Sequence, residues 1–147
     1  MTNQELFTLA QLAADRSYAP YSHFHVGAAL LTATGEVFTG CNIENSSYGA
    51  SICAERTAAV KAISEGFTEF AAIAVAGYAE EPADEAEQQE GEPLHTLWQP
   101  REAMPCGICR QFLCEVAPAL PVITQKEDGT LRESTLDVLL AGQFHLE

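Results

Sequence analysis

Two short cysteine motifs constrain this chain more than any other feature of its sequence. The first runs from Cys53 to Glu55 (C-A-E), and the second runs from Cys106 to Cys109 (C-G-I-C) directly after Pro105. The apolar pattern predicts that a helix begins at each motif. Zinc prefers four tetrahedral ligands, and a catalytic zinc site keeps one of the four positions for water. The three cysteines supply three thiolates, and Glu55 can reach towards the fourth position without binding the metal.

A C-x-x-C pair alone is also found in redox dithiols and in structural zinc sites, so the combination of motifs is what matters. A C-x-E motif followed downstream by P-C-x-x-C is typical of zinc deaminases. The rival interpretation is a closed structural site with Cys41 or Cys114 as a fourth ligand. Cys114 lies five residues beyond Cys109, roughly 140° away around an ideal helix, so it is expected to point elsewhere. A redox role for the second motif would leave the first motif unexplained.

The charge of such a site needs compensation, because three thiolates and Zn²⁺ sum to −1 and oppose the ionisation of a bound water. The positive ends of the two helices stabilise thiolates. Arg56 stands beside the first motif and is expected to donate hydrogen bonds to the sulfurs, and Arg110 is a second candidate for this role. The alternative is that either arginine is an ordinary surface charge.

The hydrophobic pattern predicts alternating helices and strands in the order α-β-β-α-β-α-β-β-α. Thr2 and Glu5 have the spacing of a capping box at the start of the first helix. We expect helices over residues 2–16, 52–65, 106–116 and 135–140, and strands over 26–31, 37–42, 71–76, 121–124 and 130–134. This order implies an α/β fold, a three-layer α/β/α arrangement with a mixed five-stranded sheet.

Composition limits the organisation of the chain and its partners. The 147 residues are predicted to form a single domain, residues 1–147, with an acidic inserted loop at about 78–104. That loop holds eight acidic residues and one arginine, half of the formal charge of −14. A loop of this length is either a solvated connection or a functional lid. Only seven basic residues are present, so a nucleic-acid partner is not expected and a small neutral substrate fits better.

Targeting signals are not expected. The chain has no apolar run long enough for a membrane span, and its N-terminus lacks the pattern of a signal peptide. Its five cysteines are therefore interpreted as metal ligands or buried thiols in a reducing compartment rather than as disulfides. A cytoplasmic location is predicted.

The chain as a whole resembles the homotetrameric zinc-dependent cytidine deaminases, within the cytidine/deoxycytidylate deaminase superfamily. Besides the two motifs, the resemblance rests on four stretches, which are residues 18–24, 26–30, 41–45 with Tyr48, and the tail containing Leu139, Leu140 and Phe144. It implies one zinc ion per subunit and hydrolysis of cytidine and 2′-deoxycytidine to uridine and 2′-deoxyuridine plus ammonia. Zinc would activate the water that attacks C4, and Glu55 would pass its proton to ring N3 and then to the leaving amine.

Substrate contacts follow from the same resemblance. Residues two apart in an extended segment project to one face, so Asn42 and Glu44 point together, and the resemblance implies that they hold the ribose. It further implies that Phe24 packs on the pyrimidine and that the backbone N–H of Ala54 contacts the base. Two aromatic side chains are expected to come from neighbouring subunits, which would leave the site incomplete in a monomer. These are Tyr48 and Phe144.

Other functions remain as alternatives. A blasticidin S-type deaminase shares the zinc motif, although residues 42–45 favour a nucleoside. A polynucleotide-editing deaminase conflicts with the scarcity of basic residues. A non-catalytic zinc-stabilised binding module would not depend on Glu55. No metal role is expected for His23 and His25. Residues 77–105 form a longer and more acidic connection than the family usually has, and they enter directly before the second cysteine motif.

Overall fold

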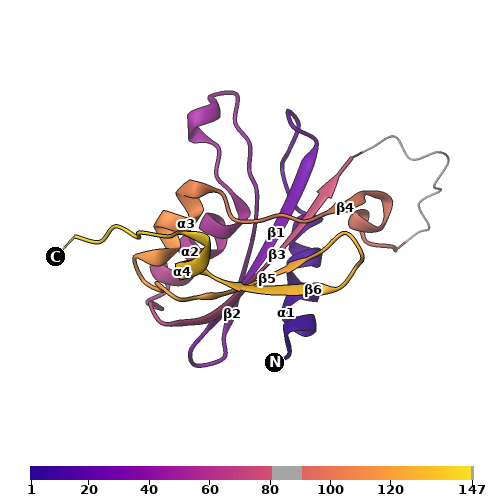
Figure 1. Cartoon of the computed structure of the whole chain (residues 1–147). Helices are drawn as coiled ribbons and strands as arrows, with labels where there is room; N and C mark the ends of the chain where they lie inside the picture. The colour runs from indigo at the N-terminus through magenta and orange to yellow at the C-terminus, as the bar shows by residue number, and fades with distance from the viewer. Residues whose placement is uncertain (81–90, 147) are drawn as a thin grey trace.

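A mixed sheet forms the middle of the molecule in the computed structural model, which describes residues 1–80 and 91–146 (Figure 1). Its strands run in the spatial order β2-β1-β3-β5-β6, and β4 pairs with β3 beside this path. All pairs are antiparallel except β3 with β5. The strands are β1 (Phe24–Thr32), β2 (Val37–Cys41), β3 (Phe70–Ala79), β4 (Gln99–Arg101), β5 (Pro121–Gln125) and β6 (Leu131–Thr135).

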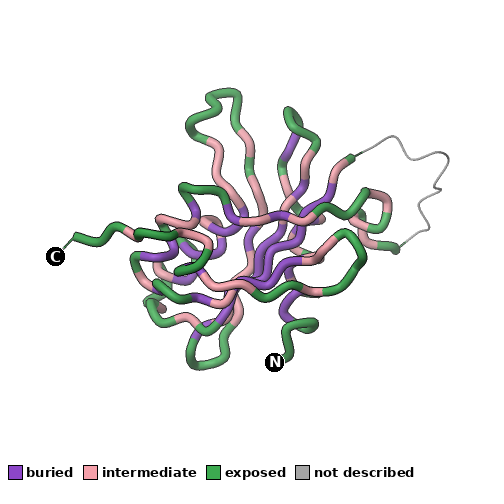
Figure 2. The backbone as a smooth tube through the Cα atoms, in the orientation of Figure 1, coloured by how far each residue is buried: buried purple, intermediate pink, exposed green. Residues whose placement is uncertain are grey.

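Helices cover both faces of this sheet, as the element order predicts. The α-helices are α1 (Asn3–Ala14), α2 (Ala54–Ser64), α3 (Gly107–Cys114) and α4 (Leu136–Leu139), and the 3₁₀ turns are η1 (Tyr48–Ala50) and η2 (Leu94–Leu97). Within β1, Ala28 and Leu30 belong to the core beneath α2, α3 and α4, whereas Ala29 belongs to the core beneath α1. This alternation follows the two-residue period of a strand. Figure 2 shows that the buried residues gather in the central strands of the sheet.

Local signals place the first helix and the last hairpin as expected. Thr2 Oγ1 accepts the Glu5 backbone N–H at 3.1 Å, and Glu5 Oε2 accepts the Thr2 N–H at 2.7 Å. The predicted capping box is thus confirmed. Gly129 has a φ of 87°, which a residue without a side chain adopts easily, and it turns the chain between β5 and β6.

Helix α2 packs closely against β2 at Gly40. A Cβ atom added to Gly40 would lie 2.5 Å from the Ala58 backbone nitrogen and 2.7 Å from the Ala54 carbonyl oxygen. Only glycine therefore allows this approach. The helix that begins directly after the first cysteine motif is held against the sheet by backbone contact.

The structure adds a strand where the sequence predicts only an acidic loop at 78–104. Residues 81–90 of that loop lie outside the described residues, but η2 and β4 belong to its second half. The parallel partner β5 pairs with β3 at Ile73 and Ala74, so the later residues of β3 keep a free edge. There β4 pairs with Gly77 to Ala79. Its short sequence contains a proline and lacks apolar alternation, which is why the pattern does not reveal it.

Several other boundaries differ slightly from the expectation, and two of them lie next to the cavity or the second cysteine motif. The strand predicted at 71–76 extends over Phe70–Ala79, and the helix predicted to reach Val116 ends at Cys114. Among the described residues, no helix combines the length and the apolar character that crossing a membrane would require.

Candidate active site

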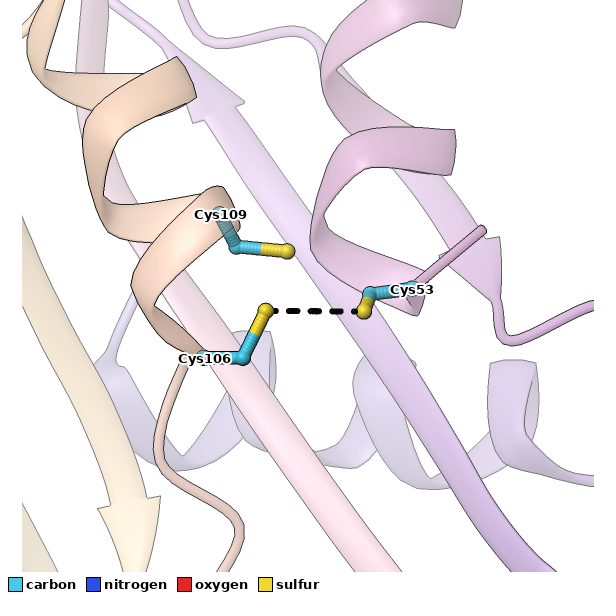
Figure 3. A group of neighbouring side chains, drawn as sticks. All are labelled: Cys53, Cys106 and Cys109. Atoms are coloured by element: carbon cyan, nitrogen blue, oxygen red, sulfur yellow. Dashed lines mark hydrogen bonds between the residues drawn. The ribbon is translucent and has the colours of Figure 1, made fainter. Parts of the chain in front are cut away.

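The sulfur atoms of Cys53, Cys106 and Cys109 meet between the first turns of α2 and α3 (Figure 3). Cys53 is the N-cap residue of α2 and Cys106 is the N-cap residue of α3, and neither side chain makes a capping hydrogen bond. Both sulfurs therefore turn away from their own helices and towards each other. Cys109 reaches the same point from the first turn of α3.

The spacing of these sulfurs fits a zinc ion. Cys53 Sγ lies 3.7 Å from Cys106 Sγ, and all three ligand atoms lie within 4.8 Å of one another. Tetrahedral zinc with Zn–S bonds of about 2.3 Å requires sulfurs roughly 3.8 Å apart. The cluster is also open on one side, because Cys109 is buried but Cys106 is exposed.

The rival site with four cysteines is not formed. In the described part of the chain, the cluster that could hold a metal contains three cysteines and neither Cys41 nor Cys114. Cys114 Sγ instead donates to the Gln111 carbonyl oxygen at 3.2 Å on its own helix. This agrees with the direction predicted from helical geometry. One tetrahedral position is left for a non-protein ligand.

Hydrogen bonds and a nearby cation favour the thiolate form of Cys53. Without metal, a hydrogen bond from the Cys109 thiol is the largest cause that lowers the pKa of Cys53, and Arg56 and Cys106 add to it. Together they outweigh burial and bring the pKa of Cys53 to about 5. Because the Cys109 thiol donates its proton to Cys53 in this hydrogen bond, the pKa of Cys109 is raised. Arg56 Nη2 lies 3.7 Å from Cys53 Sγ, which is the contact expected of a charge-compensating arginine.

Glu55 lies buried next to the sulfurs. Only 3% of its surface is exposed. Burial is the main reason that the pKa of Glu55 is raised to about 7, and the negative charge of Cys53 acts in the same direction. A carboxyl group with such a pKa can both accept and donate a proton near neutral pH.

A cavity of about 440 Å³ opens beside this group and is lined by Phe24, Asn42, Glu44, Ala54, Glu55 and Cys106, among others. None of the described residues that line it is lysine or arginine. Its polar wall is therefore acidic or neutral. This charge disfavours a substrate that carries a phosphate.

Asn42 and Glu44 both face this cavity, but much of their hydrogen-bonding capacity is used within the protein. Asn42 Oδ1 accepts the Val26 N–H at 2.9 Å, and its Nδ2 donates to the Phe24 carbonyl at 2.8 Å. Glu44 Oε1 accepts the N–H groups of Tyr21 and Ser22, each at 3.0 Å. Each side chain keeps further hydrogen-bonding positions for a ligand.

Phe24 and Ala54 occupy the apolar part of the cavity. The Phe24 ring is partly buried against the core beneath α2. Ala54 is fully buried in the first turn of α2, where backbone N–H groups have no partner within the helix. An aromatic face and free N–H donors are suited to a flat heterocyclic base.

The two aromatic residues expected from neighbouring subunits are not in the cavity of their own chain. Tyr48 is 74% exposed and contacts the Tyr21 ring edge-on at a centroid distance of 5.9 Å. Phe144 is 63% exposed, and its carbonyl accepts a hydrogen bond from Gln111 Nε2 at 3.0 Å. Both side chains are thus largely exposed in the single chain.

Arg110 contacts backbone rather than sulfur. Its Nε donates to the Pro105 carbonyl at 2.7 Å, and its Nη1 donates to the Leu139 carbonyl at 2.6 Å. Of the two arginines that the sequence suggests for charge compensation, Arg56 is the one that contacts a cysteine sulfur. Arg110 connects the second cysteine motif to the C-terminal helix α4.

Several cavity residues have no motif that would have revealed them. Glu102, Ala103 and Met104 line the cavity from the segment that leads into Pro105. Their only signal in the sequence is their position directly before a metal ligand. Ser51 and Ile52 also line the cavity from a segment between regular elements, and so does Ser22, which lies in the stretch 18–24 that carries the family resemblance.

Comparison with known proteins gives a consistent result. The family model for the "Cytidine and deoxycytidylate deaminase zinc-binding region" matches residues 1–124. A probable cytidine deaminase of Dictyostelium discoideum is 42% identical over 138 residues, which are 94% of this chain and 80% of that protein. A cytidine deaminase of Halalkalibacterium halodurans is 40% identical over 148 residues, covering 100% of this chain and 97% of the relative.

Solved structures include a similar fold. The crystal structure of cytidine deaminase from Burkholderia pseudomallei matches with a TM-score of 0.78 and 41% identity, over 98% of this chain and all of that chain. The fold and the three-sulfur site thus define a zinc-dependent deaminase, a hydrolase that acts on a C–N bond. The chain belongs to the cytidine and deoxycytidylate deaminase family, in which it carries the zinc-binding region.

Proposed function

We infer that this protein hydrolyses free cytidine and 2′-deoxycytidine to uridine and 2′-deoxyuridine, with release of ammonia. One observation carries the proposal, namely a buried carboxyl group next to three converging sulfurs in a cavity without basic side chains. Two relatives with 40% identity or more are named probable cytidine deaminase and cytidine deaminase, names that favour a nucleoside over blasticidin S. The formal charge of −14 opposes a polynucleotide substrate.

The proposed reaction adds water to C4 of the pyrimidine and breaks the bond between C4 and the exocyclic nitrogen. Zinc held by Cys53, Cys106 and Cys109 would lower the pKa of a water at its open position. Glu55 accepts the proton of the attacking water and gives it to ring N3. Its carboxyl group then assists the second transfer, to the amino group that leaves as ammonia.

The other cavity residues bind and orient the substrate in this proposal. Asn42 and Glu44 accept and donate hydrogen bonds to the ribose hydroxyls, while the Phe24 ring packs on the base. The Ala54 N–H holds the base by its edge. Tyr48 and Phe144 complete the site of a neighbouring subunit in a homotetramer, so that each site takes residues from more than one chain.

Zinc content and nucleoside turnover test the proposal together. The purified protein should contain about one zinc per chain. It should change the ultraviolet spectra of cytidine and 2′-deoxycytidine to those of uridine and 2′-deoxyuridine, and it should leave the spectrum of blasticidin S unchanged. We expect Glu55→Gln to lower kcat by about 10²–10⁴-fold, the usual contribution of a general acid–base group, with zinc retained. A Glu55→Gln protein with normal turnover would contradict the assigned role. Turnover of blasticidin S in preference to cytidine would contradict the substrate.

A further inference from the structure

Residues 94–104 return from the acidic insertion to the second cysteine motif, and we call them the returning arm. Two hydrogen bonds between Asp15 and His95, which we call the clasp, join the start of this arm to α1. Asp15 Oδ1 accepts both the backbone N–H of His95 at 2.9 Å and a hydrogen bond from its Nδ1 at 2.8 Å. The two side chains are only 18% and 14% exposed. Since Asp15 is the C-cap residue of α1, the clasp joins the arm to the end of that helix.

A ring stack fixes the middle of the returning arm. The Trp98 ring lies parallel to the His25 ring, with centroids 3.8 Å apart and planes 8° apart. His25 is buried, and its Nδ1 is hydrogen-bonded to the hydroxyl of Ser17. Neighbouring residues of a strand face opposite sides. His25 therefore faces the α1 side of the sheet, while Phe24 faces the cavity.

Beyond this stack, the arm forms one wall of the cavity. Figure 1 shows the chain passing from β4 across the sheet to α3. A Cβ atom added to Gly77 of β3 would lie 2.6 Å from the Ala103 Cβ and 3.1 Å from the Phe24 Cζ. The missing side chain of Gly77 thus lets Ala103 and Phe24 approach the same point. Ala103 and Phe24 both line the cavity.

An ion pair holds the arm at Glu102, the first residue of this wall. Arg132 Nε of β6 donates to both carboxylate oxygens of Glu102, at 3.0 Å and 3.2 Å. The arm is thus attached to α1, β1, β3 and β6, while its last residues contact the cavity. None of the attachments uses a cysteine ligand or Glu55.

We propose that the returning arm is a positioning element that determines base specificity, because its attachments hold Ala103 beside Phe24 and so set the shape of the cavity wall that the two side chains form together. The proposal rests on the proposed function, since it takes the cavity to be the site of the pyrimidine. We expect loosening the arm to leave the sulfurs and Glu55 in place, because Arg110 holds the Pro105 carbonyl between the arm and the cysteine ligands. It should therefore weaken substrate binding more than it slows the chemical step.

Two variants that release the arm test this idea, Asp15→Ala for the clasp and Trp98→Leu for the stack. We expect each to raise the KM for cytidine about 10-fold, equivalent to about 1.4 kcal/mol of binding, with kcat within about twofold. The matched control is Glu5→Ala, which removes one hydrogen bond at the other end of α1. It should lower the melting temperature without changing KM. His95→Gln provides a milder release of the clasp if Asp15→Ala does not fold.

Base analogues provide the readout of specificity. 5-Methylcytidine and N4-methylcytidine enlarge the base at two different positions. For each analogue, the readout is its kcat/KM divided by the kcat/KM of cytidine. In both releasing variants, this ratio should be higher than in the unmodified protein for at least one of the two analogues. Ala103→Val should lower the same ratio, because it narrows the pocket. Folded, zinc-loaded releasing variants with unchanged KM and unchanged ratios would overturn the proposal. If the unmodified protein does not turn over cytidine at all, the proposed function fails instead.

Discussion

At the scale of single residues, the contact between Arg56 and Cys53 distinguishes the two arginines near the metal cluster. Arg56 Nη2 approaches the Cys53 sulfur, whereas the donors of Arg110 are directed to backbone carbonyls. A guanidinium beside a sulfur stabilises its thiolate form. The charge of the cluster is therefore balanced in part by a side chain that follows a ligand by three residues on the same helix.

The hydrogen bond from Cys109, with the smaller contribution of Arg56, predicts the pH dependence of thiol alkylation in the metal-stripped protein. The pKa of Cys53 is about 5, so its thiolate persists until the pH falls through that value. The rate at which iodoacetamide modifies Cys53, followed by mass spectrometry of its peptide, should rise around pH 5 and then stay level towards neutrality. Arg56→Gln should shift the midpoint upwards.

An internal control is available in the same digest. Burial raises the pKa of Cys41, so its modification should begin only at alkaline pH. If Cys53 titrates like an unperturbed thiol, at a pH near 8.5, the proposed balance of charge is wrong. The same holds if Arg56→Gln leaves the midpoint unchanged.

At the scale of elements, α3 depends on the C-terminal segment as well as on the sheet. Arg110 joins the carbonyl of Pro105, which precedes the ligand Cys106, to the carbonyl of Leu139 at the end of α4. The planar guanidinium donates in two fixed directions at once, which an ammonium group on a flexible stem does not reproduce. We therefore infer that Arg110 positions Pro105 through the direction of its hydrogen bonds and not through its charge.

Exchange of Arg110 tests this assignment. Arg110→Gln and Arg110→Lys should both speed the release of zinc to a coloured chelator by about 10-fold, the lower end of the effect of outer-shell partners on metal affinity. Lys126→Gln removes a cation from the β5–β6 hairpin and should release zinc at the normal rate. Full recovery in Arg110→Lys would show that charge, and not the two-way contact, is what matters.

At the scale of the whole molecule, two exposed aromatic side chains are the residues through which the proposed tetramer would share its sites. Tyr48 and Phe144 are largely exposed and do not line the cavity of their own chain. In the proposed tetramer, each completes the site of another subunit. A site built in this way can be reconstituted from two inactive variants.

Mixing experiments test whether sites are shared. Glu55→Gln and Phe144→Ala should each be weakly active alone. After they are dissociated and reassembled together, a site can combine Glu55 of one chain with Phe144 of the other, which restores about one quarter of the sites at random mixing. Mixing without dissociation is the control. Absence of recovery, or an active monomer, would mean that each chain holds a complete site.

The sequence alone predicted much of the architecture and the metal cluster. The capping box of Thr2 and Glu5, the strands, and the helix starts at the cysteine motifs depend on local spacing and hydrophobic period, and these are properties of neighbouring residues. The same is true of the three sulfurs, because tetrahedral zinc limits which cysteines can combine. The family resemblance added the substrate contacts, and these roles remain predictions.

Only the tertiary structure determined the contacts between segments that lie far apart in the chain. The pairing of β4 with β3, the stacking of Trp98 on His25 and the clasp between Asp15 and His95 join residues separated by about twenty to eighty positions. No periodicity encodes such a contact, because each partner looks like an ordinary loop or surface residue until the sheet brings them together. Local spacing thus determined the chemistry of the site, and long-range packing determined the shape of its cavity.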